Sequence, residues 1–139
     1  MRNPYYVFWA DAIRRYRKHH PNDKDWDARV FVLNTWVHGL NFWTIVLWLK
    51  YFGILIIPPL EIDLFPGDLL DNLIAFIIEF VLFWGILNYF LIFHKKRYKK
   101  ILLKYGEFKT NYAVIYGITI TLLSFFSAIL YSYLNNWFK

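Results

Sequence analysis

The chain has 139 residues, of which 58% are hydrophobic and 23% aromatic, and its 16 Lys and Arg against 10 Asp and Glu give a formal net charge of +6. It has no cysteine, which excludes disulfides, thiolate nucleophiles and cysteine-based zinc or iron–sulfur sites. Three apolar runs each reach the ~20 residues that cross a hydrocarbon core. Little is left for a soluble domain, so the composition predicts an all-α integral membrane protein with a single membrane domain over residues 1–139.

The first predicted element is a helix over residues 4–20. Asn3 can cap it, and Pro4 suits its first position. Apolar residues recur along it at helical spacing, at Tyr5, Phe8, Trp9, Ala12, Ile13 and Tyr16. This basic, amphipathic pattern predicts a helix that lies in the headgroup layer, or one whose apolar face packs on the chain's own inner loop or on a partner. The N-terminus lacks a continuous apolar segment with a cleavage site, so we expect no removable signal peptide.

Three membrane spans follow, over about 31–57, 69–93 and 112–134. The second helix is predicted to continue to about 105, because an apolar stripe persists beyond the span and Gly106 supplies a stop. Its last third would project into the cytosol. That part would lie on the same side of the membrane as the N-terminal helix, so the two could pack together.

The charges predict the orientation of these spans. Fourteen of the 16 Lys and Arg fall before the first span or between the second and third spans. The loop between the first two spans has no cation and carries four acids, Glu61, Asp63, Asp68 and Asp71. Because cytoplasmic loops carry the excess of Lys and Arg, we expect a cytoplasmic N-terminus and an external C-terminus.

Nine basic residues are candidates for contact with anionic lipid headgroups on the inner face of the bilayer. They are Arg14, Arg15, Arg17, Lys18, Lys95, Lys96, Arg97, Lys99 and Lys100. A recognised nucleic-acid-binding motif is missing, so nucleic acid is not the expected partner.

A second group of candidates is polar and lies within the spans. Glu79 interrupts the apolar run of the second span, and counting ~1.5 Å per residue from the span ends puts it near the same depth as Asn41 and Thr121. An ionised carboxylate there is costly, so Glu79 should be protonated or paired with Asn41, His38 or Thr121. This cluster is interpreted either as a proton-titrating or ligand-contacting site, or as a set of hydrogen bonds that fixes the register of the helices.

The third span carries a stripe of small residues that would let another helix approach closely. Its members are Ala113, Gly117, Thr121, Ser124 and Ala128. By contrast, His38 has no second ligand at matched depth, and no catalytic triad, phosphate loop or carboxylate pair is visible. We therefore expect no metal, no cofactor and no enzymatic activity.

The segments NYFLIFHKKRYKKILLKYGEF (Asn88–Phe108) and WVHGLNFWTIVLWLKYFGI (Trp36–Ile54) resemble small three-span inner-membrane proteins of Gram-negative bacteria, a group with no assigned activity. The resemblance implies the bacterial inner membrane and a three-span architecture. The function expected from the sequence is that of a non-catalytic accessory subunit of a larger inner-membrane complex, either with other subunits or by self-association. The alternatives are a membrane-embedded immunity protein and an oligomeric proton- or ion-coupled carrier that uses Glu79.

Overall fold

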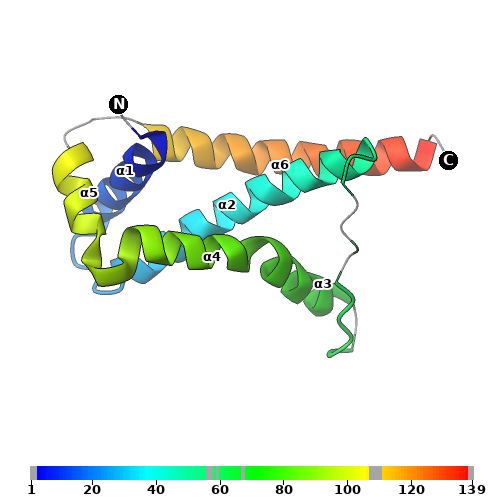
Figure 1. The fold of residues 1–139 in the computed structure, drawn as a ribbon, viewed down its shortest axis with the longest axis horizontal. Helices are drawn as coiled ribbons and strands as arrows, with labels where there is room; N and C mark the ends of the chain where they lie inside the picture. Colours follow the sequence, from blue (N-terminus) through cyan, green and yellow to red (C-terminus); the bar gives the residue numbers. More distant parts are fainter. Residues whose placement is uncertain (1–2, 56–57, 59, 67, 107–110, 138–139) are drawn as a thin grey trace. The chain divides into compact units, whose positions relative to one another are not determined.

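The computed structural model describes residues 3–55, 58, 60–66, 68–106 and 111–137, and among these residues all regular structure is helical (Figure 1). In chain order the elements are α1 (Pro4–His19), α2 (Trp26–Tyr51), α3 (Asp68–Phe76), the π-helical turn η1 (Ile77–Val81), α4 (Leu82–Asn88), the π-helical turn η2 (Tyr89–Phe93), the 3-10 turn η3 (His94–Lys96), α5 (Tyr98–Tyr105) and α6 (Tyr112–Trp137). In the described part of the chain, three helices are long and apolar enough to span a membrane, at Trp26–Tyr51, Asp68–Lys96 and Tyr112–Asn136. The predicted all-helical class with three candidate spans is therefore confirmed.

The chain forms two compact units. The first unit consists of Met1–Thr35 and Gly85–Thr119, and the second consists of Trp36–Trp84 and Ile120–Lys139. Each unit has its own set of interior contacts, and the two are described in turn.

In the first unit, α1 is capped as the sequence predicts. The Asn3 side chain accepts a hydrogen bond from the backbone N–H of Tyr5 at 3.0 Å, and Pro4 occupies the first turn. Six consecutive residues, Phe8 to Ile13, are buried. Six residues cover more than a full turn, so the middle of α1 is enclosed on all sides. Of the expected alternatives, contact with the chain's own inner segment is the one that the structure contains, because α1 shares a hydrophobic core with Ile101 and Tyr105 of α5.

The prediction of one long second helix continuing to about 105 is wrong. Lys95 and Lys96 adopt left-handed backbone conformations with φ of 52° and 56°, which breaks the helical hydrogen-bond ladder. The physical reason is tertiary: the break lets α5 pack its apolar stripe on α1, where a straight continuation could not reach. Figure 1 shows α1 and α5 side by side at the left of the view. Gly106 does end α5 as predicted, as its C-cap.

The helix of the first predicted span is shifted toward the N-terminus. It begins at Trp26 and ends at Tyr51, whereas the prediction placed the span over 31–57, and residues 56–57 lie outside the described residues. Gly53 terminates it with a left-handed φ of 69°, and the N–H of Ile54 donates a hydrogen bond to the carbonyl oxygen of Leu49, with an N–O distance of 2.9 Å. This is a glycine-based helix end, which the sequence analysis did not identify.

In the second unit, the carboxylate of Asp71 holds the loop that precedes α3. The buried carboxylate of Asp71 accepts hydrogen bonds from the N–H groups of Leu64 at 3.2 Å and Phe65 at 3.5 Å.

In the same unit, α2 and η1 are in close contact at Gly39. A Cβ added to this glycine would come within 2.8 Å of Val81 Cγ2 in η1. Glycine at this position is what allows the two backbones to approach.

Candidate functional site

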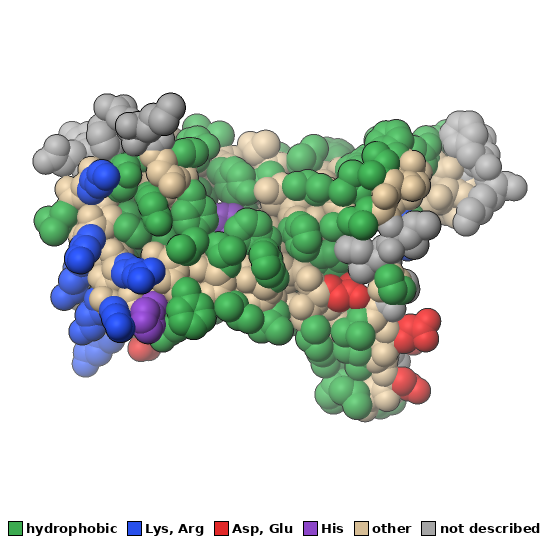
Figure 2. All heavy atoms as spheres, in the orientation of Figure 1, with side chains coloured by type: hydrophobic (Ala, Val, Ile, Leu, Met, Phe, Trp, Pro, Cys, Tyr) green, Lys and Arg blue, Asp and Glu red, His purple; other side chains and the backbone are tan. Residues whose placement is uncertain are grey.

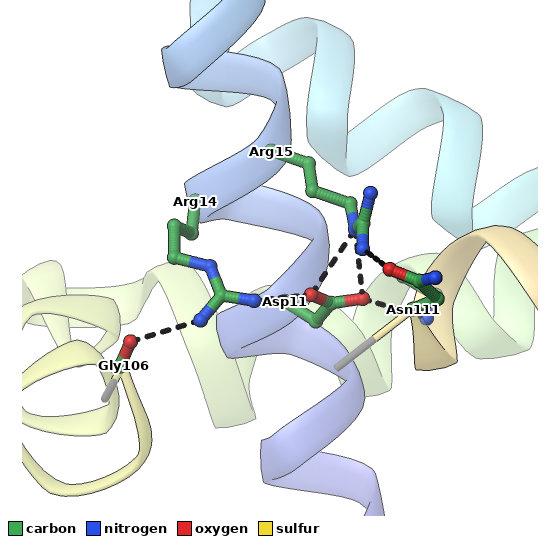
Figure 3. Close-up of polar contacts among 6 residues, drawn as sticks. Asp11, Arg14, Arg15, Gly106 and Asn111 are labelled. Atoms are coloured by element: carbon green, nitrogen blue, oxygen red, sulfur yellow. Dashed lines mark hydrogen bonds and ion pairs between the residues drawn. The ribbon is translucent and has the colours of Figure 1, made fainter. Parts of the chain in front are cut away.

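Asp11 of α1 is a buried charged group in the first unit (Figure 3). Its side chain is 1% exposed, and its Oδ1 lies 2.6 Å from Arg14 Nη2 and 3.2 Å from Arg15 Nε. Its Oδ2 accepts a hydrogen bond from the backbone N–H of Ala113 at 3.0 Å. A carboxylate removed from water needs such partners, because an unpaired buried charge is costly. The Asp11 carboxylate is therefore compensated by two guanidinium groups and one backbone N–H.

The two arginines extend this network to the ends of two other helices. Arg14 Nη1 donates to the carbonyl oxygen of Gly106, the C-cap of α5, at 3.0 Å, and Arg15 Nη2 donates to the side-chain oxygen of Asn111, just before α6. A cation thus lies at the C-terminus of α5, while the Asp11 carboxylate lies at the N-terminus of α6. Each such pairing with a helix dipole is worth typically ~0.3–1 kcal/mol at exposed sites and up to ~2 kcal/mol where partly buried.

An aromatic core surrounds the rest of α1. The ring centroid of Trp9 lies 5.5 Å from that of Phe93, and the ring of Phe8 lies 5.3 Å from that of Tyr116, both edge-on. Such pairs add ~0.5–1.5 kcal/mol each beyond their buried area. The aromatic rings position α1 against η2 and α6, and the Asp11 network then fixes the ends of α5 and α6.

A second buried network links α1 to α2 and α4 in the same unit. The hydroxyl of Tyr5 donates to Asn88 Oδ1 at 2.6 Å, and Asn88 Nδ2 donates to Thr35 Oγ1 at 3.0 Å. Asn88 is fully buried. Burial is the main cause that raises the pKa of the Tyr5 hydroxyl to about 12, so Tyr5 stays a neutral donor across the physiological range.

The structure places the four predicted intramembrane polar residues in different surroundings within the chain. Glu79, in η1, is half-buried, and among the described residues its carboxylate accepts a hydrogen bond from the N–H of Leu60 at 2.6 Å rather than from His38, Asn41 or Thr121. His38 is buried with its ring centroid 5.2 Å from that of Trp84. Thr121 is exposed on α6. A functional cluster of these four side chains stays a prediction, and the geometry assigns Glu79 to the loop before α3.

The contact between α2 and α6 in the second unit is polar at its centre. Thr44 and Ser124 share a hydrogen bond of 2.7 Å between their hydroxyl oxygens, and Trp48 Nε1 donates to Ser127 Oγ at 3.0 Å. A mostly apolar cavity of about 370 Å³ opens beside these pairs, and Asn41 is among the residues that line it.

The residues of the predicted small-residue stripe on α6 differ in burial and in their contacts. Ser124 takes part in the α2 contact, Ala113 and Ala128 are half-buried, and Thr121 is exposed. Among the described residues, a Cβ added to Gly117 would meet no heavy atom within 4 Å, so this glycine leaves open space for a side chain.

The predicted lipid-contact residues fall into two groups. Arg14 and Arg15 are half-buried and belong to the Asp11 network, so their guanidinium groups already serve the fold. The others are exposed, namely Arg17, Lys18, Lys95, Lys96, Arg97, Lys99 and Lys100. Figure 2 shows Lys and Arg side chains gathered over α5 at the left of the view.

Sequence reasoning missed Asp11, Asn88 and Gly39. Asp11 did have a signal, because it is the single acid among residues 4–20 and is followed by arginines at i+3 and i+4. Asn88 and Gly39 had none, since nothing in their neighbourhood along the chain indicates which helix they meet.

The polar groups of these sites mostly bind one another. Among the described residues no three His, Cys, Asp or Glu side chains come together in a group that could hold a metal ion. The Asp11 network neutralises helix ends and the Asn88 network cross-links helices. Their chemistry is that of fixing helices in place.

Comparisons of this chain with protein-family models, curated proteins and solved structures return no match. The resemblance to small inner-membrane proteins of Gram-negative bacteria stays a prediction. The functional argument therefore depends on the geometry of the chain.

Proposed function

We propose that the protein is a non-catalytic accessory subunit of a larger membrane protein assembly. The supporting observation is an open groove of about 520 Å³ on α6 in the second unit, lined by Ala128, Ile129, Ser132, Tyr133 and Asn136. Ser132 exposes a polar side chain within a helix that is otherwise apolar enough to span a membrane. Polar groups on a spanning helix favour contact with protein over lipid, and a small residue such as Ala128 lets a second helix come close.

The low coverage of the apolar helices supports the same proposal. Only 17% of the apolar window is buried by the chain itself in each of the helices Asp68–Lys96 and Tyr112–Asn136. Much helix surface is thus available to lipid and to other subunits. We infer that the groove is where a partner helix binds.

The proposed membrane is the bacterial inner membrane, with the N-terminus in the cytoplasm and the C-terminus outside. The bacterial inner membrane is proposed from the resemblance of Trp36–Ile54 and Asn88–Phe108 to small inner-membrane proteins of Gram-negative bacteria. The orientation is supported by the charge distribution, because the basic segments and the acidic loop alternate along the chain in the order that the positive-inside bias favours.

The test is a pull-down of the tagged protein from its native membrane in a mild detergent, with the bound proteins identified by mass spectrometry. Wild-type protein should retain a stoichiometric membrane partner, and Ala128→Leu, which fills the groove, should lose it. Leu130→Phe is the matched control, since it changes an exposed residue about 200° around α6 and should retain the partner. Retention by both variants, or no partner with wild type, would refute the proposal.

A further inference from the structure

A second cavity, of about 380 Å³, lies in the first unit where α1 meets α5. Arg14 and Arg17 line it from α1, and Leu102, Leu103 and Gly106 line it from the C-terminal part of the α5 segment. Its walls thus combine two guanidinium groups with two leucines. We propose that this cavity binds one anionic phospholipid, with the phosphate at Arg17 and the first part of an acyl chain along the leucines.

The charge of the cavity favours an anion. Arg14 and Arg15 share the single negative charge of Asp11, so those three residues together retain a charge of +1. Arg17 is exposed and adds a second positive charge. The α5 helix that forms the other wall contains Lys99, Lys100 and Lys104 and no acid.

Arg17 is also held in position. Its guanidinium carbon lies 5.2 Å from the ring centroid of Trp26, over the ring. Stacking of this kind uses the flat face of the guanidinium and leaves its N–H edge for a planar fork of hydrogen bonds to phosphate. A lysine in the same place would offer a point charge without that fork.

The apolar wall selects an amphiphile rather than a free anion. Leu103 is 84% exposed, on a short helix whose other exposed positions are lysines. An inorganic phosphate or a nucleic acid backbone would leave this leucine uncovered, whereas an acyl chain covers it and removes its apolar surface from water. The combination fits a phospholipid with a net negative headgroup. This proposal goes beyond the accessory-subunit role and does not depend on a protein partner.

The test uses the full-length protein in a neutral detergent, titrated with dioleoyl-phosphatidylglycerol and observed by native mass spectrometry. Wild type should retain one phosphatidylglycerol in preference to dioleoyl-phosphatidylcholine. Arg17→Gln should reduce that retention by roughly fivefold, which corresponds to the ~1 kcal/mol expected of one well-placed basic residue. Lys18→Gln removes the same charge from the next position, also exposed but outside the cavity, and should bind as wild type does.

A second variant tests the apolar wall. Leu103→Gln should also weaken phosphatidylglycerol retention. Because Leu103 is exposed, the variant should keep the helical content and thermal unfolding of wild type, and both are measured to check that the fold is intact. Equal loss in Arg17→Gln and Lys18→Gln would show diffuse charge attraction and overturn the proposal. Displacement of the lipid by inorganic phosphate, with Leu103→Gln without effect, would identify a free-anion site and also overturn it.

Discussion

Asp11 receives hydrogen bonds or ion pairs from three donors on two helices, and two of these donors, Arg14 and Arg15, are cations that its negative charge compensates. If the charge is removed, Arg14 and Arg15 are left half-buried beside each other without their anion. We expect Asp11→Asn to lower the free energy of unfolding by about 3 kcal/mol, the lower end of the range for breaking a buried ion pair, because Asn keeps one acceptor oxygen. Thermal unfolding followed by circular dichroism in mild detergent measures this.

The control is the same chemical change at an exposed acid. Asp63→Asn alters an exposed loop residue and should change the free energy of unfolding by an amount typical of surface positions, within ~0.5 kcal/mol. Equal effects of the two variants would mean that the Asp11 network does not support the fold.

Tyr5 gives a pH dependence whose direction can be worked out. Its pKa is raised from 10.0 to about 12, so between those pH values the unfolded chain releases a proton that the folded chain keeps. Stability contributed by the neutral Tyr5 hydroxyl is therefore present below about pH 10 and is lost as the pH rises toward 12. Tyr5→Phe lacks this group, so the difference in unfolding midpoint between wild type and variant should shrink over that interval. A constant difference would argue against a partly buried Tyr5 donor.

At the scale of elements, the break between η2 and α5 requires Lys95 and Lys96 to adopt left-handed backbone conformations. A left-handed conformation costs an L-residue roughly 1–2 kcal/mol, and glycine adopts it freely. Lys96→Gly should therefore be neutral or stabilising, whereas Lys99→Gly, inside α5, should destabilise by about 1 kcal/mol. Denaturation of both variants tests the kink directly, because in an unbroken helix both glycines would destabilise alike.

The contact of α2 with η1 depends on the absence of a side chain at Gly39. An alanine Cβ there would lie 2.8 Å from Val81 Cγ2 and 3.3 Å from Val81 Cα, so backbone as well as side chain must move. We expect Gly39→Ala to destabilise by about 1–3 kcal/mol, as overpacking does, in spite of the better helix propensity of alanine. Gly117→Ala has open space and should be neutral or slightly stabilising, and thermal unfolding of the pair distinguishes the two sites.

These elements also show what the sequence could predict. Local sequence patterns predict the Asn3 cap, the Gly106 stop and the three apolar helices. Each depends on residues that are close together in the sequence. The break at Lys95 and Lys96 could not be predicted, because the lysines have no local preference for it and the reason lies in the α1 surface that α5 covers. Asp11 belongs between these cases: its arginine neighbours are local, but its bond to Ala113 joins residues 102 positions apart.

For the whole molecule, the charge pattern makes a testable statement about topology. If the basic segments are cytoplasmic, Lys99 is inside and Asp63, in the acidic loop, is outside. The chain has no cysteine, so single substitutions Asp63→Cys and Lys99→Cys create unique labelling sites, and both positions are exposed. A membrane-impermeant maleimide applied to intact spheroplasts should label Asp63→Cys, and should label Lys99→Cys only after permeabilisation.

Each labelling pattern has a distinct physical meaning. Labelling of Lys99→Cys alone in intact spheroplasts would mean the opposite orientation, in which the basic α5 segment and the lipid cavity face away from the cytoplasm. Labelling of both positions in intact spheroplasts would place them on the same side of the membrane. One crossing helix between them would place them on opposite sides, so this result would mean that the helix Asp68–Lys96 does not cross the membrane. The expected pattern requires that this helix cross the bilayer despite its π-helical turns, with Glu79 held by the loop amide of Leu60.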